Sequence, residues 1–410
     1  MTRKAHMPSL ALLMVTTLAW GNDAEPISFE ESLLNGTSHF SVRYRYEHVD
    51  DDRFSSKANA STARFRLNYQ TEIWRDWSVF AEFDHVAELA TDNYASGAGT
   101  SSPRRARYPV IADPKGSDLN QVYVDYKGLS SLQFRVGRQR ILLDDQRFVG
   151  AVGWRQNEQA YDGITINSNN IDNIRVHYSY VDRVNRIFGD SVSAGRHDAR
   201  IHLINAKISL SERWQLTPYL YAIDNHDAAP FSTRTTGIRI TGALTIGTTS
   251  AKIEGGFAHQ SDAADNPVNY NALYYQLAGS LFVSEATELT IGIETLAGDK
   301  NKPGKAFRTP LATLHKFQGW ADQFLTTPDA GIQDLYVSTT HKLQGWTLRG
   351  TYHDFAAAEG SSNWGQEIDI SANRAIGRHY GVLVKIAQFK ADDPAFQDAT
   401  KLWLQLTAKF

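Results

Sequence analysis

The chain has 410 residues, a formal net charge of −3 and no cysteine. The lack of cysteine excludes a disulfide framework, a thiolate metal site and a cysteine nucleophile, and the near-neutral charge gives no indication of nucleic-acid binding. After the first residues there is no apolar run of about eighteen residues, which excludes a protein that crosses a membrane with helices. A β-barrel is still compatible, because only every second residue of a spanning strand must face lipid.

The start of the chain predicts an export signal over residues 1–21. Two basic residues precede a short apolar stretch at 10–18, and a small-x-small cleavage site lies before Asn22. Residues 22–38 are interpreted as a short periplasmic lead-in, followed by one barrel domain over residues 39–410.

Apolar and polar side chains alternate strictly in short segments from residue 39 onward. The first such segment is Phe40–His48, and the next is Ala63–Ile73. Period-two alternation is typical of strands with one apolar and one polar face. We expect about eighteen strands, or sixteen if the weaker segments are not all strands; these are residues 161–167, 200–210 and 332–340.

Links between the expected strands alternate between short and long. In outer-membrane barrels the periplasmic turns are short and the extracellular loops long, and an even strand number leaves both termini in the periplasm. Tryptophans beside the short turns are typical of a girdle at the lipid headgroups; they are Trp74, Trp77, Trp214 and Trp346. The predicted fold is all-β, a transmembrane antiparallel up-and-down β-barrel, with a soluble β-sandwich as the alternative.

The last segment, Thr400–Phe410, alternates over a length suited to a tilted transmembrane strand. A terminal phenylalanine on such a strand resembles the signal that the barrel assembly machinery of Gram-negative bacteria reads. We therefore expect location in the outer membrane, in contact with lipid and lipopolysaccharide.

If apolar residues face lipid, the intervening charged residues line the lumen. The expected lining includes Arg43, Arg45, Arg64, Arg66, Arg135, Arg239 and Arg349, with Lys207, Lys385 and Lys401, and with Glu367 and Asp369 among the carboxylates. Arginines concentrate on the first strands, and such a wall suits anions because a guanidinium can hold a carboxylate with two hydrogen bonds. The alternative is that these charges pair with one another and brace the barrel.

Two links are too apolar for solvated loops, namely residues 138–159 and 307–322. Bulky residues such as Phe148 and Trp154 indicate that the first link folds into the lumen and narrows it. The charged residues expected in this constriction are Arg138, Arg140, Asp144, Asp145, Arg147, Arg155 and Glu158. We expect it to lie opposite the basic wall of Arg43, Arg45, Arg64 and Arg66.

Several short motifs resemble those of the alginate export porins. They are Arg43-Tyr44-Arg45-Tyr46-Glu47, Leu143-Asp144-Asp145-Gln146-Arg147-Phe148, Trp154-Arg155-Gln156-Asn157-Glu158-Gln159, Tyr161-Asp162-Gly163, Thr309-Pro310-Leu311-Ala312-Thr313 and Gln366-Glu367-Ile368-Asp369. The resemblance spans nearly the whole mature chain. It implies an outer-membrane barrel whose basic, loop-narrowed lumen passes an anionic uronate polymer.

The expected function is a passive, anion-preferring channel for uronate oligosaccharides or similar small acidic solutes. A polymer exporter and a less selective general porin are the alternatives, followed by an outer-membrane enzyme or a structural barrel. No Gly-x-Ser-x-Gly motif occurs, and the thirteen histidines show no metal-ligand spacing. The sequence therefore predicts no catalytic residue, no metal and no cofactor.

Overall fold

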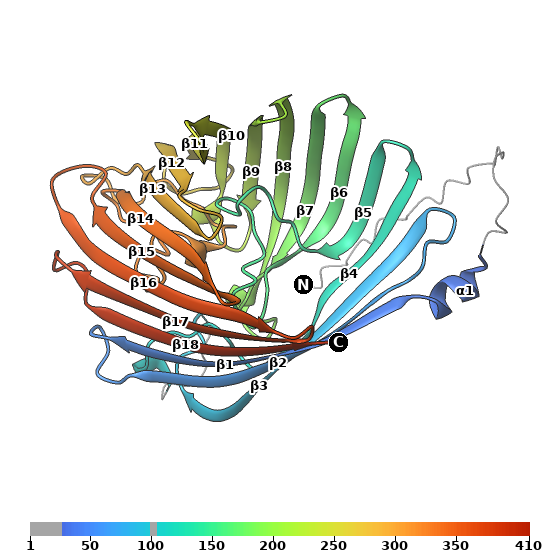
Figure 1. Ribbon diagram of the computed structural model, residues 1–410, viewed down its shortest axis with the longest axis horizontal. Helices are drawn as coiled ribbons and strands as arrows, with labels where there is room; N and C mark the ends of the chain where they lie inside the picture. Colours follow the sequence, from blue (N-terminus) through green and yellow to red (C-terminus); the bar gives the residue numbers. More distant parts are fainter. Residues whose placement is uncertain (1–26, 99–104) are drawn as a thin grey trace, which may run out of the picture.

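The computed structural model describes residues 27–98 and 105–410, so the expected signal peptide lies outside the described residues. Within these ranges eighteen antiparallel strands form one closed sheet, in which each strand pairs with its neighbours in the chain. Figure 1 shows the strands following one another around the wall, from blue to red. The predicted all-β up-and-down barrel and its eighteen strands are confirmed. No helix within the described ranges is long and apolar enough to cross a lipid bilayer.

The strands are β1 (Thr37–Asp51), β2 (Ala58–Gln70), β3 (Trp77–Asn93), β4 (Gly116–Leu129), β5 (Leu132–Gln139), β6 (Ala160–Ile171), β7 (Ile174–Asn185), β8 (Arg196–Ser211), β9 (Trp214–Asn225), β10 (Thr233–Ile246), β11 (Thr249–Asp262), β12 (Asn271–Phe282), β13 (Thr287–Leu296), β14 (Ile332–Leu343), β15 (Trp346–Ala356), β16 (Asn363–Ile376), β17 (Tyr380–Ala391) and β18 (Ala399–Lys409). The helical elements are α1 (Phe29–Leu34) and the single turns η1 (Arg105–Arg107), η2 (Ser193–Gly195), η3 (Ala229–Phe231) and η4 (Leu314–Lys316). The three segments that were weak in the sequence are all strands, β6, β8 and β14.

The barrel closes where the first strand meets the last. Strands β1 and β18 pair from Ser41 with Lys409 to Asp51 with Ala399. Just beyond this ladder, the Phe40 amide donates to the Phe410 carbonyl at 3.0 Å and the Phe410 amide donates back to Phe40 at 2.8 Å. Closure leaves no free sheet edge, so every strand finds hydrogen-bond partners on both sides.

Alternation along β18 separates a lipid face from a lumenal face. Leu402 and Leu404 are each 37% exposed, whereas Lys401 is 5% exposed and Trp403 is fully buried. A soluble β-protein would bury the leucines and expose the lysine. The reversed pattern is that of a membrane barrel, with an apolar outer band and a polar or filled interior.

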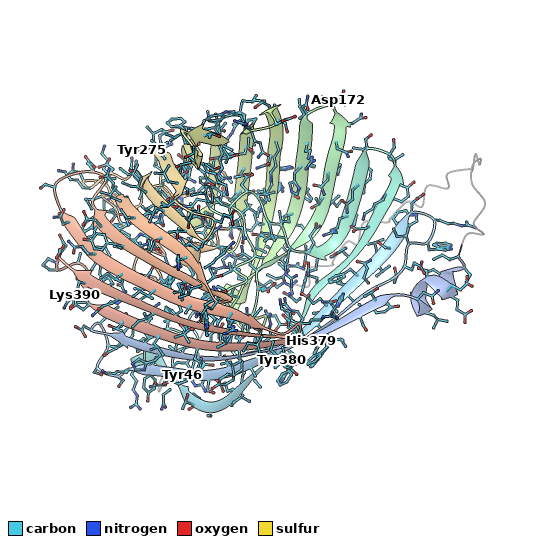
Figure 2. The ribbon with its side chains drawn as sticks, viewed as in Figure 1. Tyr46, Asp172, Tyr275, His379, Tyr380 and Lys390 are labelled. Carbon is cyan, nitrogen blue, oxygen red and sulfur yellow. The ribbon has the colours of Figure 1, made fainter. Side chains whose placement is uncertain are left out.

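The links at one end of the barrel, the short-turn end, have two to six residues, and those at the other end, the long-loop end, have six or more. Figure 2 marks the two ends of β17, with Tyr380 at the short-turn end and Lys390 at the long-loop end. The short links are residues 71–76, 130–131, 172–173, 212–213, 247–248, 283–286, 344–345 and 377–379. The sequence places the third turn at residues 168–170, but β6 continues to Ile171, and Asn173 takes the left-handed backbone conformation that the tight turn needs (φ 64°).

The described part of the lead-in holds the short helix α1, at the short-turn end. The Ser28 hydroxyl accepts a hydrogen bond from the Glu31 amide at 3.1 Å, while the Glu31 carboxylate accepts one from the Ser28 amide, so the helix begins with a capping box. The ring of Phe29 packs edge-on against Trp74 with 5.4 Å between centroids. The barrel itself starts at Thr37, slightly before the predicted residue 39.

Candidate functional site

Two long links fold into the barrel from the loop end and join each other there. Val149 forms an isolated parallel bridge with Leu311, and the Gly150 amide donates to the Leu311 carbonyl at 2.9 Å. We call these two links, residues 140–159 and 297–331, the plug. The first link folds inward as predicted, and the second link, which was expected only to be too apolar for a solvated loop, packs against it.

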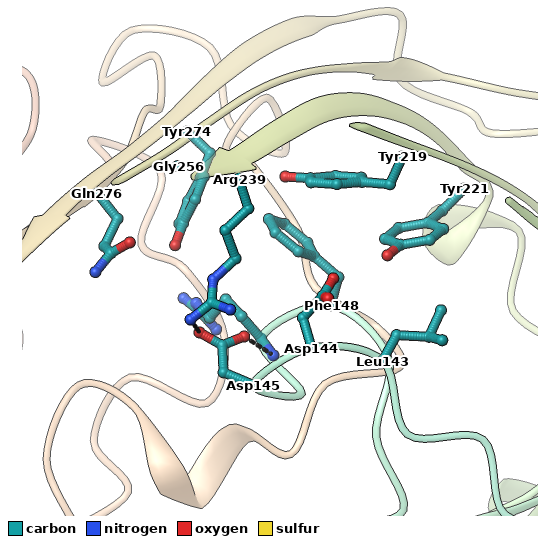
Figure 3. A pocket seen from close by; sticks show the side chains of 11 residues that line it. Leu143, Asp144, Asp145, Phe148, Tyr219, Tyr221, Arg239, Gly256, Tyr274 and Gln276 are labelled. Carbon is teal, nitrogen blue, oxygen red and sulfur yellow. Dashed lines mark hydrogen bonds and ion pairs between the residues drawn. The ribbon is translucent and has the colours of Figure 1, made fainter. Parts of the chain in front are cut away.

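Phe148 anchors the plug on the far wall. Its ring centroid lies 5.3 Å from that of Tyr219 on β9 and 5.1 Å from that of Tyr274 on β12. Next to this aromatic contact, the Asp145 carboxylate pairs with Arg239 of β10 at 3.3 Å (Figure 3). An aromatic side chain that would be unfavourable in a solvated loop is thus half-buried against inward-facing tyrosines.

Arginines of β1 hold the backbone of the plug. Arg43 Nη1 donates to the Gly153 carbonyl at 2.9 Å, and Arg45 Nη2 donates to the Trp154 carbonyl at 2.6 Å. The Arg45 guanidinium also lies 4.0 Å above the Trp154 ring. The expectation that the plug lies opposite the basic wall is wrong. It lies on that wall, because its carbonyl oxygens and carboxylates satisfy the buried guanidiniums there.

Glu158 is the main counter-ion of the basic wall. Its Oε1 lies 3.1 Å from Arg64 Nη1 and 3.0 Å from Arg66 Nη1, and its other oxygen accepts from Arg140. Burial alone would raise the pKa of Glu158, but the three guanidiniums together lower it to about 2. Glu158 is therefore ionised at neutral pH, and the positive charge of this wall is largely neutralised.

A second buried network joins both parts of the plug to the wall. Asp322 pairs with Lys401 of β18 at 2.7 Å and with Arg155 at 3.4 Å, and Arg155 also pairs with Glu47 of β1 at 3.1 Å. His315 Nδ1 lies 2.7 Å from Asp322. Burial lowers the pKa of His315 to about 3, so the ring is neutral at pH 7 and donates its Nδ1 proton to Asp322.

Lys385 of β17 lies in a tryptophan cage formed by the plug and the wall. Its Nζ is 3.6 Å from the Trp320 ring, 4.3 Å from the Trp154 ring and 5.0 Å from the Trp403 ring. The same atom donates to His315 Nε2 at 2.7 Å. The sequence places Lys385 and Lys401 in the lumen, but it gives no signal for His315 and Asp322, since their role depends on how the second link folds.

Most of the other residues expected in the lumen pair with polar groups of the protein, and Arg138, which was expected in the constriction, lies on β5 in the wall. Arg135 pairs with Asp125 at 2.7 Å, Arg138 with Asp162 at 2.8 Å, Arg147 with Glu294 at 2.6 Å, Arg239 with Glu254 at 2.7 Å, and Asp144 accepts from Asn205 at 2.7 Å. Glu367 and Asp369 accept from the Ala321 amide at 2.7 Å and the Trp320 amide at 3.2 Å. Arg349 makes no ion pair within residues 27–98 and 105–410 and lies 6.0 Å from the Trp320 ring. Most of these charges brace the plug and the wall.

A cavity of about 680 Å³ lies between the plug and the long loops, and we call it the loop-side cavity. Six basic side chains line it, Arg53, Arg147, Arg155, Arg186, Arg308 and Lys401, against two carboxylates, Asp51 and Asp322. Four of the six pair with carboxylates. Across the described part of the chain, Arg186 and Arg308 have no carboxylate within 4 Å.

A second cavity, of about 590 Å³, lies between the plug and the short turns, and we call it the turn-side cavity. Its lining includes Lys127, Arg175 and Lys207, of which Lys207 pairs with Asp144 of the plug at 3.6 Å. None of the described residues that line it is acidic. Leu142 and Leu143 of the plug form its inner boundary. Both cavities flanking the plug therefore carry more basic than acidic side chains.

The family model described as alginate export matches residues 37–281, which is more than half of the chain. The chain belongs to the alginate export family. This alginate export family member matches no curated protein sequence.

Solved structures share the fold of this alginate export family member at low sequence identity. OpdK of Pseudomonas aeruginosa, crystallised with vanillate, is 12% identical with a TM-score of 0.70, and the match covers 92% of this chain and 99% of that one. OccAB2 of Acinetobacter baumannii is 15% identical with a TM-score of 0.72, covering 93% and 99%. OpdO of P. aeruginosa is 16% identical with a TM-score of 0.69, covering 93% and 98%. The matching family is described as alginate export, and one of the solved structures with this fold is described as an outer-membrane protein.

Proposed function

We propose that this protein is a passive outer-membrane channel that prefers small organic anions. The observation that carries the proposal is the excess of basic side chains in both cavities that flank the plug. In a narrow passage with low-dielectric walls, such charges act more strongly than they would in bulk water. An anion leaving one cavity meets a second basic cavity beyond the plug, whereas a cation is repelled from both.

Selectivity is assigned to the cavity arginines and lysines rather than to the basic wall of the first strands. Arg64 and Arg66 are neutralised by Glu158, and Arg66 also binds Asp84 at 2.6 Å. By contrast, Arg175 of the turn-side cavity has no carboxylate within 4 Å across the described residues. A charge without a protein counter-ion is free to attract a solute.

The solute class follows from the family and from the plug. Membership of the alginate export family supports uronates, and the vanillate bound to OpdK supports small carboxylates more generally. The plug is fixed at several points of the wall, which favours uronate monomers and short oligosaccharides over a long polymer. Export of a polymer is the second candidate, favoured by the family alone, and would require the plug to move aside.

The orientation in the membrane is part of the proposal. By the pattern of bacterial barrels, the short turns and both termini lie in the periplasm, and the long loops lie outside among lipopolysaccharide. Residues 1–21 would direct export and be removed.

Reversal potentials in planar bilayers test the proposal. With a gradient of KCl, the wild-type channel should give a potential of the sign set by chloride. Chloride is then replaced by glucuronate and by a uronate trisaccharide, and glucuronate should carry current while longer oligomers carry progressively less. A potential set by potassium, or a barrel that conducts no ions, would contradict the proposed function.

A further inference from the structure

The two cavities differ in chemistry although both are basic. Apolar side chains form much of the loop-side cavity, including Val110, Phe188, Phe231, Leu314 and Phe324. The turn-side cavity is instead lined mainly by polar groups, which include Ser130, Ser131, Asn167, Asn169 and Asn205. An apolar chamber at the loop end offers few hydrogen-bond partners to solutes that are covered with hydroxyl groups.

Arg186 lies on aromatic side chains at the wall of this chamber. It follows β7, and its guanidinium is 5.1 Å from the Phe188 ring and 5.9 Å from the Phe231 ring. One nitrogen, Nη1, donates to the Ala194 carbonyl at 3.0 Å. Burial lowers the pKa of Arg186. A guanidinium has further N–H donors, and no carboxylate of the described ranges 27–98 and 105–410 lies within 4 Å to accept from them.

We propose that the loop-side cavity binds a carboxylate that carries an apolar or aromatic body, with Arg186 holding the carboxylate. This inference rests on the proposed function and specifies its ligand class. A guanidinium can grip a carboxylate with two parallel hydrogen bonds. The ring of the ligand packs among Phe188, Phe231 and Phe324, where offset and edge-on aromatic contacts are favourable.

Size and desolvation favour such a ligand over a uronate. The cavity volume of about 680 Å³ falls within the range of roughly 300–1,000 Å³ typical of small-molecule sites. Burying an apolar body removes apolar surface from water, which is favourable. Each hydroxyl of a uronate would lose water against an apolar wall without gaining a hydrogen-bond partner, which is unfavourable.

The test measures block of the chloride current by added solutes in planar bilayers. The probes are benzoate, glucuronate, which has the same charge without the apolar body, and benzyl alcohol, which has the ring without the charge. Benzoate should block saturably at roughly tenfold lower concentration than either of the others, a difference of about 1.4 kcal/mol. R186Q should raise the half-blocking concentration of benzoate by about tenfold, and F188S should do so by a few-fold.

Arg213 provides the matched control, because it is exposed on a short turn at the other end of the barrel. Benzoate should block R213Q at the same concentration as it blocks the wild type. Heat-modifiable migration verifies the fold of every variant. The inference is overturned, while anion preference stands, if glucuronate or benzyl alcohol blocks as tightly as benzoate. It is also overturned if benzoate blocks R186Q and F188S at the same concentration as the wild type. A channel that prefers cations would overturn the proposed function as well.

Discussion

Glu158→Gln should loosen the plug from the basic wall. The substitution keeps the size of the side chain but removes the charge that faces Arg64, Arg66 and Arg140. The pKa of Glu158 falls from 4.5 to about 2 in the folded protein, and at about 1.4 kcal/mol per unit this corresponds to about 3 kcal/mol of stabilisation. The loss of one partner of a buried ion pair costs a similar amount, roughly 3–5 kcal/mol.

Urea unfolding of the lipid-reconstituted barrel measures this effect, and open-channel current noise reports on the plug. The free energy of unfolding of E158Q should be about 3 kcal/mol lower than that of the wild type, and its open-channel current noise should be greater. Glu285→Gln, on an exposed short turn, is the matched control and should change neither quantity. If E158Q and E285Q behave alike, the pairing of Glu158 with the three arginines does not hold the plug.

The same ion pairs predict that the free energy of unfolding falls as the pH is lowered. Because the folded pKa lies below the unfolded one, the stabilisation is complete above about pH 4.5 and is lost as the pH falls toward 2. Wild type should therefore approach E158Q in strong acid. E158Q should lack this part of the dependence, since glutamine does not titrate.

Three further predictions concern the plug. Deletion of residues 144–154 should raise single-channel conductance while migration stays heat-modifiable, and unchanged conductance would show that this link does not limit the current. Phe148→Ala should cost about 3 kcal/mol in urea unfolding through the lost contacts with Tyr219 and Tyr274; an unfolding energy equal to wild type would refute that anchoring role. Because burial lowers the pKa of His315 to about 3, stability should fall as pH drops from 6.5 toward 3, and H315Q should flatten that slope; a slope unchanged in H315Q would contradict the neutral ring.

The barrel could be predicted because lipid and lumen impose opposite demands on alternate residues. In β18, Leu404 and Lys401 fall on the expected faces, and the strand number follows from repeating this pattern along the chain. Phe148 and Trp154 indicated an inward link for the same reason, since bulky apolar groups are unfavourable in solvent.

The partners inside the lumen could not be predicted, because they depend on contacts between distant residues. Glu158 meets Arg64 from another part of the chain, so alternation shows that Arg64 faces inward but not that its charge is neutralised. Arg186 and Asp322 lie on links without periodicity, where the sequence gives no side-chain direction. As a result, the basic wall that was expected to select anions is a brace, and the candidate selectivity residues lie in the two cavities.

Removal of charge from the turn-side cavity tests the account most directly. The measurement is the reversal potential in a KCl gradient for wild type, for the double variant R175Q/K207Q and for the control R213Q. Wild type and R213Q should share a potential set by chloride, and R175Q/K207Q should shift toward zero because two of the basic groups lining that cavity are gone. A wild-type potential set by potassium, or a double variant identical to wild type, would contradict the claim that the cavities make this barrel an anion channel.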